Sequence, residues 1–213
     1  MMPNHLPSPV QPRLSNARAP QTGASLIVVM LILIVVSILG VGGIQIAMMA
    51  ERATRSDRDK QIAWQATEAG LLDAEYDILG LPAGSATRRD SIFKLKATDI
   101  SQFISGCGSS GATKGLCAYI PSTKPAWLTV NFDATGSSAA TAEFGAFTGR
   151  AFPSGTAGIQ PAKPPRYIIE PIPDPSYSRT ENPEGMRYIY RVTVMGFGPN
   201  TDTQTVLQMI YRN

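Results

Sequence analysis

The sequence predicts an α+β protein. A long N-terminal helix crosses a membrane with its first half and covers a C-terminal antiparallel β-sheet with its second half. Three features predict this fold: an uncharged apolar run, a proline-free amphipathic stretch directly after it, and alternating β-type residues near the C-terminus. The 213 residues are enough for one domain and one membrane anchor.

Residues 1–23 are expected to form a cytoplasmic leader peptide. They are rich in proline and offer little to bury, so they predict neither a helix nor a core. Arg13 and Arg18 precede the apolar run and no acidic residue does, which predicts a cytoplasmic N-terminus. Everything after Glu51 should then lie outside the cytoplasm.

Residues 24–50 are expected to form the transmembrane half of the helix. The apolar run from Leu26 to Ala50 has 25 residues, and no charge occurs between Arg18 and Glu51. A membrane-spanning helix needs roughly 20 such residues. The alternative is a buried helix of a soluble core, but such helices average only about 11–12 residues and seldom lack a polar face.

Residues 51–80 are expected to form the amphipathic, periplasmic half of the same helix. Two apolar stripes favour packing on the head and on neighbouring subunits, although a two-sided core helix would show the same pattern. Gly80, Pro82 and Gly84 end the helix. Continuous from Ala24, it would measure about 84 Å. The residues expected to pack are Ile62, Trp64, Ala66, Ala69, Leu71, Leu72 and Tyr76, with Ile78 and Leu79 continuing the stripes.

Residues 81–213 are expected to form a globular α+β head with a disulfide loop at 107–117. Cys107 and Cys117, the two cysteines of the chain, follow the apolar run and so lie where disulfides persist. Their spacing favours a structural disulfide, because zinc needs four ligands and a redox pair favours Cys-x-x-Cys. Such a bridge contributes about 2–3 kcal/mol.

The last part of the chain predicts an antiparallel meander. Alternation predicts strands at 166–170, 186–197 and 203–211, with a turn at 198–202. The helix at 51–79 can cover this sheet. Residues 133–165 form a long irregular connection, of a kind that is either functional or disordered. Its aromatic residues either pack on the sheet or expose a binding patch: Phe144, Phe147 and Phe152.

The sequence offers no catalytic, metal-binding or cofactor-binding group, and we expect no enzyme. The single histidine, His5, lies before the span, so the head has no histidine base or ligand. The pairs Asp57/Asp59 and Asp73/Asp77 are expected on a polar helix face, solvated or paired with Arg and Lys. A net charge of +3 does not indicate nucleic-acid binding. No phosphate loop or small-molecule site is apparent.

Gly23 directly before the apolar run resembles the cleavage site of type IV prepilins. In those proteins a membrane peptidase cuts after a glycine, the new terminal residue is usually N-methylated, and the apolar segment is kept. The resemblance implies cleavage between Gly23 and Ala24. Two positions differ from the common pattern: the first mature residue is Ala24 rather than Phe, and the fifth is Val28 rather than Glu.

Several further segments resemble the PilX family of type IV pilus assembly proteins. In that family a helix of the type E-R-M-A-G-N…D-R…A-x-Q-A-A-E-A follows the membrane segment. The matching segments here are Glu51-Arg52, 57–63, 65–69, Gly115-Leu116-Cys117 with Pro125-Ala126-Trp127, and Arg191-Val192-Thr193 with Gly196-Phe197-Gly198. Thr54-Arg55-Ser56 stands where the family usually has Ala-Gly-Asn.

This resemblance implies a pilin-like fold and a minor pilin that primes type IV pilus assembly. Its partners would be other minor pilins, the major pilin, the inner-membrane assembly platform and the prepilin peptidase. It would be a single-pass inner-membrane protein with a periplasmic head, carried into the pilus on assembly. Val28 in place of Glu favours a low-copy position at the tip. The alternatives are a membrane-anchored periplasmic binding domain and an adhesin carried on the pilus.

Overall fold

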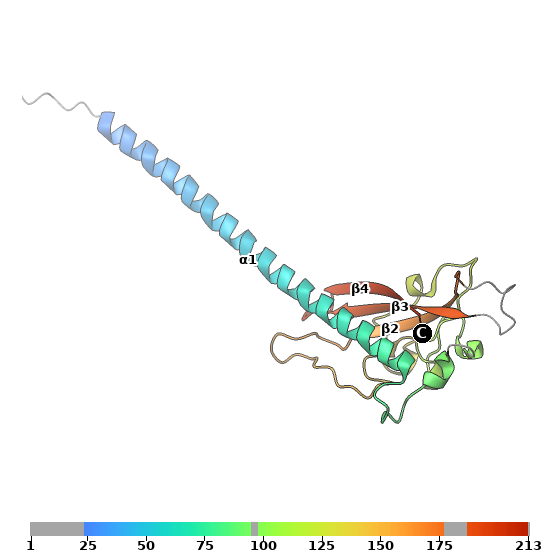
Figure 1. Ribbon diagram of the computed structural model, residues 1–213. Coiled ribbons are helices and arrows are strands. Elements are labelled where there is room, and N and C mark those ends of the chain that lie inside the picture. The colour runs from blue at the N-terminus through green and yellow to red at the C-terminus, as the bar shows by residue number, and fades with distance from the viewer. Residues whose placement is uncertain (1–23, 95–97, 177–186, 213) are drawn as a thin grey trace, which may run out of the picture. The chain divides into compact units, whose positions relative to one another are not determined.

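The computed structural model describes residues 24–94, 98–176 and 187–212, and Figure 1 shows its one long helix and its sheet. The helix α1 runs from Ala24 to Leu79. The strands are β1 (Ala142–Glu143), β2 (Arg166–Pro173), β3 (Tyr188–Phe197) and β4 (Gln204–Tyr211). Short 3-10 helices lie at Asp90–Phe93, Ile100–Gln102, Gly111–Thr113, Ala126–Leu128 and Gly136–Ser138. The chain divides into two compact units, Met1–Glu51 and Arg52–Asn213.

The first unit contains the apolar part of α1. Its large apolar side chains between Leu26 and Met49 are each at least 46% exposed. The hydroxyl of Ser37 donates to the carbonyl of Leu33 at 2.7 Å, so this polar group is satisfied inside the helix. Within the described residues, α1 is the one helix long and apolar enough to cross a membrane.

The second unit contains a four-stranded antiparallel sheet in the order β1-β2-β3-β4. The predicted meander is therefore confirmed. Strand β2 continues to Pro173, beyond the predicted end at 170, because both Pro171 and Pro173 have register partners on β3. Strand β1 is a two-residue addition inside the 133–165 connection, where we predicted no strand.

One face of the sheet packs against the second half of α1, which lies across the strands in Figure 1. The buried core between them includes Tyr167 and Ile169 from β2 and Tyr190, Val192 and Val194 from β3. The buried positions of α1 recur at helical spacing and include small and polar residues: Ala63, Ala66, Thr67, Gly70, Asp73, Ala74, Asp77 and Ile78. These small residues allow the helix to approach the strands closely.

The residues expected to pack are spread around this face. Ala66 is buried, and Leu71 is partly buried against the core. Ile62, Ala69 and Tyr76 are half-buried. Two of the expected residues point away from the core: Trp64 is 48% exposed and Leu72 is 41% exposed.

The opposite face of the sheet is covered by the segment that follows the cysteine loop. A second cluster contains the disulfide, Phe132 and Ile168, with Trp127 and Met195 packed beside them. The aromatic residues of the 133–165 connection also pack rather than forming an exposed patch. Phe144 and Phe147 are buried, and the rings of Phe144 and Phe152 lie 5.0 Å apart.

Gly196 of β3 lies close against the backbone of α1. A Cβ at this position would lie 2.6 Å from the carbonyl oxygen of Ala63 and 2.6 Å from the amide nitrogen of Thr67. The Cβ would also meet the hydroxyl of Thr67, but the two backbone atoms cannot turn away as a side chain can, so the helix itself would have to move.

We therefore expect Gly196→Ala to lower the free energy of unfolding by about 1–3 kcal/mol, since the helix must move off the strand. Gly84→Ala is the matched control, because a Cβ at Gly84 meets nothing within 4 Å. It should change stability by less than about 0.5 kcal/mol. Urea denaturation of the full chain in detergent measures both, and equal stabilities of the two variants would contradict the prediction.

Candidate functional site

The predicted processing residues lie at the start of α1. Gly23 is outside the described residues, and Ala24 is the first residue of α1. Val28 lies in the first turns of the helix and is 56% exposed. Cleavage and methylation at Gly23 and Ala24 therefore stay predictions.

A buried ion pair joins the end of α1 to the head. Asp77 Oδ2 accepts a hydrogen bond from Arg89 Nη2 at 2.6 Å, and Asp77 Oδ1 accepts one from Arg89 Nε at 3.0 Å. The hydroxyl of Tyr167 on β2 donates to Asp77 Oδ2 at 2.9 Å. The two charged side chains are at most 1% exposed. Burial raises the pKa of the Tyr167 hydroxyl well above its ordinary value, so this group stays a donor.

Arg89 extends this network into the disulfide loop. Its Nη1 donates to the carbonyl oxygens of Ala112 and Lys114, both at 2.7 Å. Its guanidinium carbon lies 3.4 Å from the centroid of the Phe147 ring. One arginine thus joins α1, the loop between the cysteines and the connection before β2.

Asp73, one helical turn before Asp77, holds the turn that follows β1. Its carboxylate accepts hydrogen bonds from the Thr148 hydroxyl at 2.6 Å and from the Gly145 amide at 2.8 Å. Arg150 Nη1 lies 3.4 Å from Asp73 Oδ1. Burial raises the pKa of Asp73 above its ordinary value, and these partners oppose the shift.

These contacts correct the expectation for one of the two aspartate pairs, Asp73 and Asp77. Asp73 and Asp77 do pair with arginines, but they lie on the buried face of α1 and not on a polar face. Asp57 is exposed and Asp59 pairs with Arg58 at 3.3 Å, as expected for a polar face. The reason is that Asp73 and Asp77 find donors in the head, which makes their burial tolerable.

Cys107 and Cys117 form the predicted disulfide. The residues beside Cys117 hydrogen-bond to β2: the Cys117 amide donates to the Ile169 carbonyl at 2.9 Å, and the Ile169 amide donates to the Gly115 carbonyl at 2.9 Å. The loop therefore continues the sheet beyond the short strand β1. Cys117 itself is fully buried beneath the segment that covers this face.

An apolar strip lies on the exposed side of the second half of α1. It is formed by side chains that are 40–48% exposed: Trp64, Leu72 and Leu79. The indole nitrogen of Trp64 donates to Glu68 at 2.8 Å, which satisfies the one polar group of the ring. Among the described residues, no group of three or more side chains could hold a metal ion.

Comparison with known protein families gives two matches that together cover residues 22–213. The family described as "Type IV pilus assembly protein PilX C-term" matches residues 55–213. The family described as "PilX N-terminal" matches residues 22–72. Comparison with curated proteins and with solved structures gives no match.

Proposed function

Because the chain belongs to the PilX family of type IV pilus assembly proteins, we propose that it is a minor pilin that takes part in priming pilus polymerisation. The proposal depends on the different surroundings of the two parts of helix α1. Its first part exposes apolar side chains all round, and its second part is built into the head by Asp73 and Asp77. A subunit of this kind can leave the bilayer only if other apolar helices replace the lipid.

In this proposal the helix has two successive environments. Before assembly the apolar part of α1 crosses the inner membrane, with the leader in the cytoplasm and the head in the periplasm. During assembly the same side chains pack against the helices of other minor pilins and of the major pilin. The outer strip of Trp64, Leu72 and Leu79 offers the same partners a second apolar surface, on the part of α1 that belongs to the head. The assembly platform and the prepilin peptidase act on the membrane-bound form.

Processing at Gly23 is the experiment that tests the proposal. We expect mass spectrometry of the membrane-extracted protein to give an N-terminus at Ala24, methylated on its amine. A strain without the prepilin peptidase should give the uncleaved chain. An uncleaved protein in peptidase-competent cells would contradict the proposal and favour the alternative of a membrane-anchored periplasmic binding domain.

Val28 supports a position at or near the tip of the pilus. Pilins with Glu at the fifth mature position use it to meet the terminal amine of the adjacent subunit, and such a carboxylate is costly in lipid without a partner. Val28 makes no such contact, so the protein needs no subunit ahead of it. The amine of Ala24 would still be available to a partner.

We therefore expect Val28→Glu to change copy number or placement in the pilus while leaving the stability of the head unaltered. Immunogold labelling of purified pili measures the placement, and urea denaturation measures the stability. Val28→Ile is the matched control, since it keeps the segment apolar. Labelling of the wild-type protein that is spread evenly along the pilus, at the density of the major subunit, would contradict the tip assignment.

A further inference from the structure

The two edges of the sheet differ in how their backbone groups are paired. At one edge β1 has only two residues, and the cysteine loop covers part of β2. The Ile169 amide donates to the Gly115 carbonyl and the Cys117 amide donates to the Ile169 carbonyl, both at 2.9 Å. Pro171 and Pro173, further along β2, have no N–H group to donate. This edge therefore offers few groups to a further strand.

The other edge, strand β4, has none of these protections. It is the last strand of the sheet, and Figure 1 shows it at the margin of the head. It pairs with β3 over its whole length without a bulge, and it contains no proline and no charged residue. Proteins usually interrupt such an edge with a charge, a proline or a bulge, because a long regular edge pairs with other chains. Strand β4 is therefore a template for one more strand.

The outward hydrogen-bonding groups of β4 belong to alternate residues. The Gly198 amide donates to the Thr203 carbonyl at 2.7 Å, so Thr203 directs its backbone groups toward the chain of β3. This direction alternates along an antiparallel strand. The residues whose N–H and C=O groups point outward are therefore Gln204, Val206, Gln208 and Ile210. Their side chains are all exposed, and no other strand in the described part of the chain pairs with this side of β4.

The side chains of β4 leave apolar surface on both faces of the sheet. Val206 and Ile210 are 47% and 57% exposed on the face away from α1. On the face toward α1, Leu207, Met209 and Tyr211 are only half-buried. A further strand would cover part of both faces. Because no charge lies along β4, a charged side chain beside it would lose water without gaining a partner.

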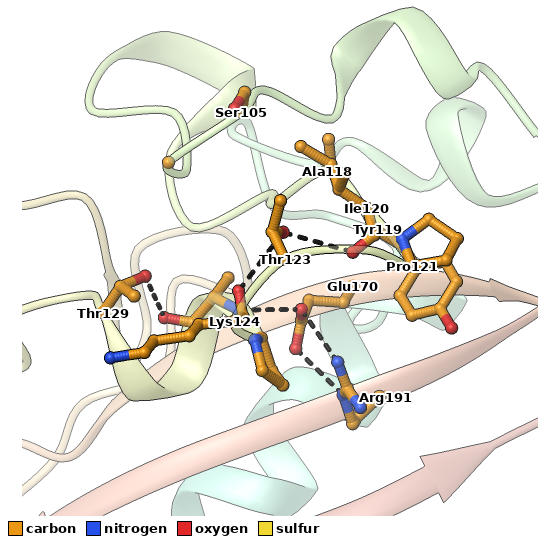
Figure 2. A pocket seen from close by; sticks show the side chains of 13 residues that line it. Ser105, Ala118, Tyr119, Ile120, Pro121, Thr123, Lys124, Thr129, Glu170 and Arg191 are labelled. Atoms are coloured by element: carbon orange, nitrogen blue, oxygen red, sulfur yellow. Dashed lines mark hydrogen bonds and ion pairs between the residues drawn. The ribbon is translucent and has the colours of Figure 1, made fainter.

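The polar groups of a cavity on the face of the sheet away from α1 are paired differently. This cavity has a volume of about 350 Å³, and Figure 2 shows Glu170 and Arg191 in its wall. Glu170 is 1% exposed and accepts hydrogen bonds from Arg191 Nε at 2.9 Å, from Arg191 Nη2 at 3.0 Å and from the Ala126 amide at 3.2 Å. This buried carboxylate is satisfied within the head, whereas the outward groups of β4 have no strand to pair with in the described chain.

We propose that β4 binds an extended segment of another protein, which joins the sheet as a fifth strand antiparallel to β4. An extended backbone places its own N–H and C=O groups opposite all the outward groups of β4. The antiparallel direction continues the pattern of the sheet. The segment is uncharged over its middle residues and places β-branched or other apolar side chains beside Val206 and Ile210.

The partner is a different protein and not a second copy of this chain. Two antiparallel β4 strands would be related by a two-fold axis, which reverses the direction of α1 in one head relative to the other. Two chains anchored in one membrane enter their heads from the same side, so they cannot pair in this way. This choice of partner rests on the proposed membrane-anchored function, whereas the pairing edge itself does not.

The test measures amide hydrogen exchange by NMR on the full chain in detergent micelles. The probe is acetyl-Ser-Val-Thr-Val-Thr-Val-Lys-amide with each valine nitrogen methylated, so that one edge of the peptide is blocked and the peptide cannot assemble with itself. Its dissociation constant should be about 1 mM or below. At about ten times that concentration, exchange of the Val206 and Gln208 amides should slow about tenfold. The amides of Leu207 and Met209 point to β3 and should change less than about twofold.

A second peptide isolates the backbone contact. It has the same sequence, with the threonine nitrogens methylated as well, so both of its edges are blocked. It should bind at least about tenfold more weakly, because it loses several hydrogen bonds to β4.

A pair of variants isolates the same contact on the protein. Val206→Pro removes one outward N–H and leaves the hydrogen bonds to β3 in place, so it should weaken binding at least about tenfold. Val206→Thr is the matched control, since it keeps the N–H and the β-branched shape, and should change the dissociation constant by less than about threefold. Urea denaturation shows whether each variant is folded. If Val206→Pro is not, the comparison of the two peptides decides.

Four outcomes would overturn the proposal. The first is unchanged exchange up to about 10 mM peptide. The second is equal binding of the two peptides. The third is slowed exchange at Leu207 and Met209 with no change at Val206 and Gln208. The fourth is slow exchange at Val206 without peptide, together with a dimer in analytical ultracentrifugation, which would assign the edge to a second copy. Processing at Gly23 is measured separately, so each of the two proposals can fail without the other.

Discussion

Replacing Asp77 with Asn should lower the free energy of unfolding of the head by about 3–5 kcal/mol. The substitution keeps the size of the side chain and removes its charge. Arg89, which is 1% exposed, is then left as a buried cation without a counterion. Because Arg89 also holds the carbonyl groups of Ala112 and Lys114, the loss should loosen the disulfide loop together with the end of α1.

Urea denaturation of the full chain in detergent, followed by near-ultraviolet circular dichroism, measures this effect. Asp57→Asn is the matched control on the same helix, since Asp57 is exposed, and it should cost less than about 0.5 kcal/mol. The double variant Asp77→Leu with Arg89→Met should be more stable than Asp77→Asn, because neither charge of this pair is then buried without its partner. Equal stabilities of Asp77→Asn and Asp57→Asn would show that the ion pair does not hold the helix to the head.

Removing the disulfide by Cys107→Ser with Cys117→Ser should lower the free energy of unfolding by about 3 kcal/mol. The bridge joins residues separated by 10 positions, and the closure of so short a loop contributes about 2–3 kcal/mol. A further loss is expected because the loop between the cysteines presents the carbonyl groups that Arg89 binds. The unbridged loop must be ordered before these hydrogen bonds form.

A double-mutant cycle separates the two contributions. The cysteine variant and Arg89→Met should be non-additive by at least about 0.5 kcal/mol, since both remove the same contact between α1 and the loop. Wild-type protein reduced with dithiothreitol is the control for the serine substitutions themselves. Additive effects within the error of the measurement would mean that the disulfide and Arg89 stabilise the head independently.

The sequence by itself was sufficient for the features that depend on local composition and periodicity. The uncharged run from Leu26 to Ala50 predicts an apolar helix without reference to any other part of the chain. The period-two alternation predicts β3 and β4 within two residues of their observed ends. The cysteine spacing favours the disulfide because the alternatives need ligands or a spacing that the chain does not have.

Only the tertiary structure decided which face of α1 is buried. Hydrophobic periodicity assumes that aspartate and threonine face water, so it placed Asp73 and Asp77 on a polar face. Their partners Thr148 and Arg89 are 75 and 12 positions away, and nothing in the local pattern of α1 reveals them. The same holds for Glu170 and Arg191, which meet only through the register of β2 and β3. A buried charge is tolerated only where the fold brings its partner, and that is a property of the assembled chain.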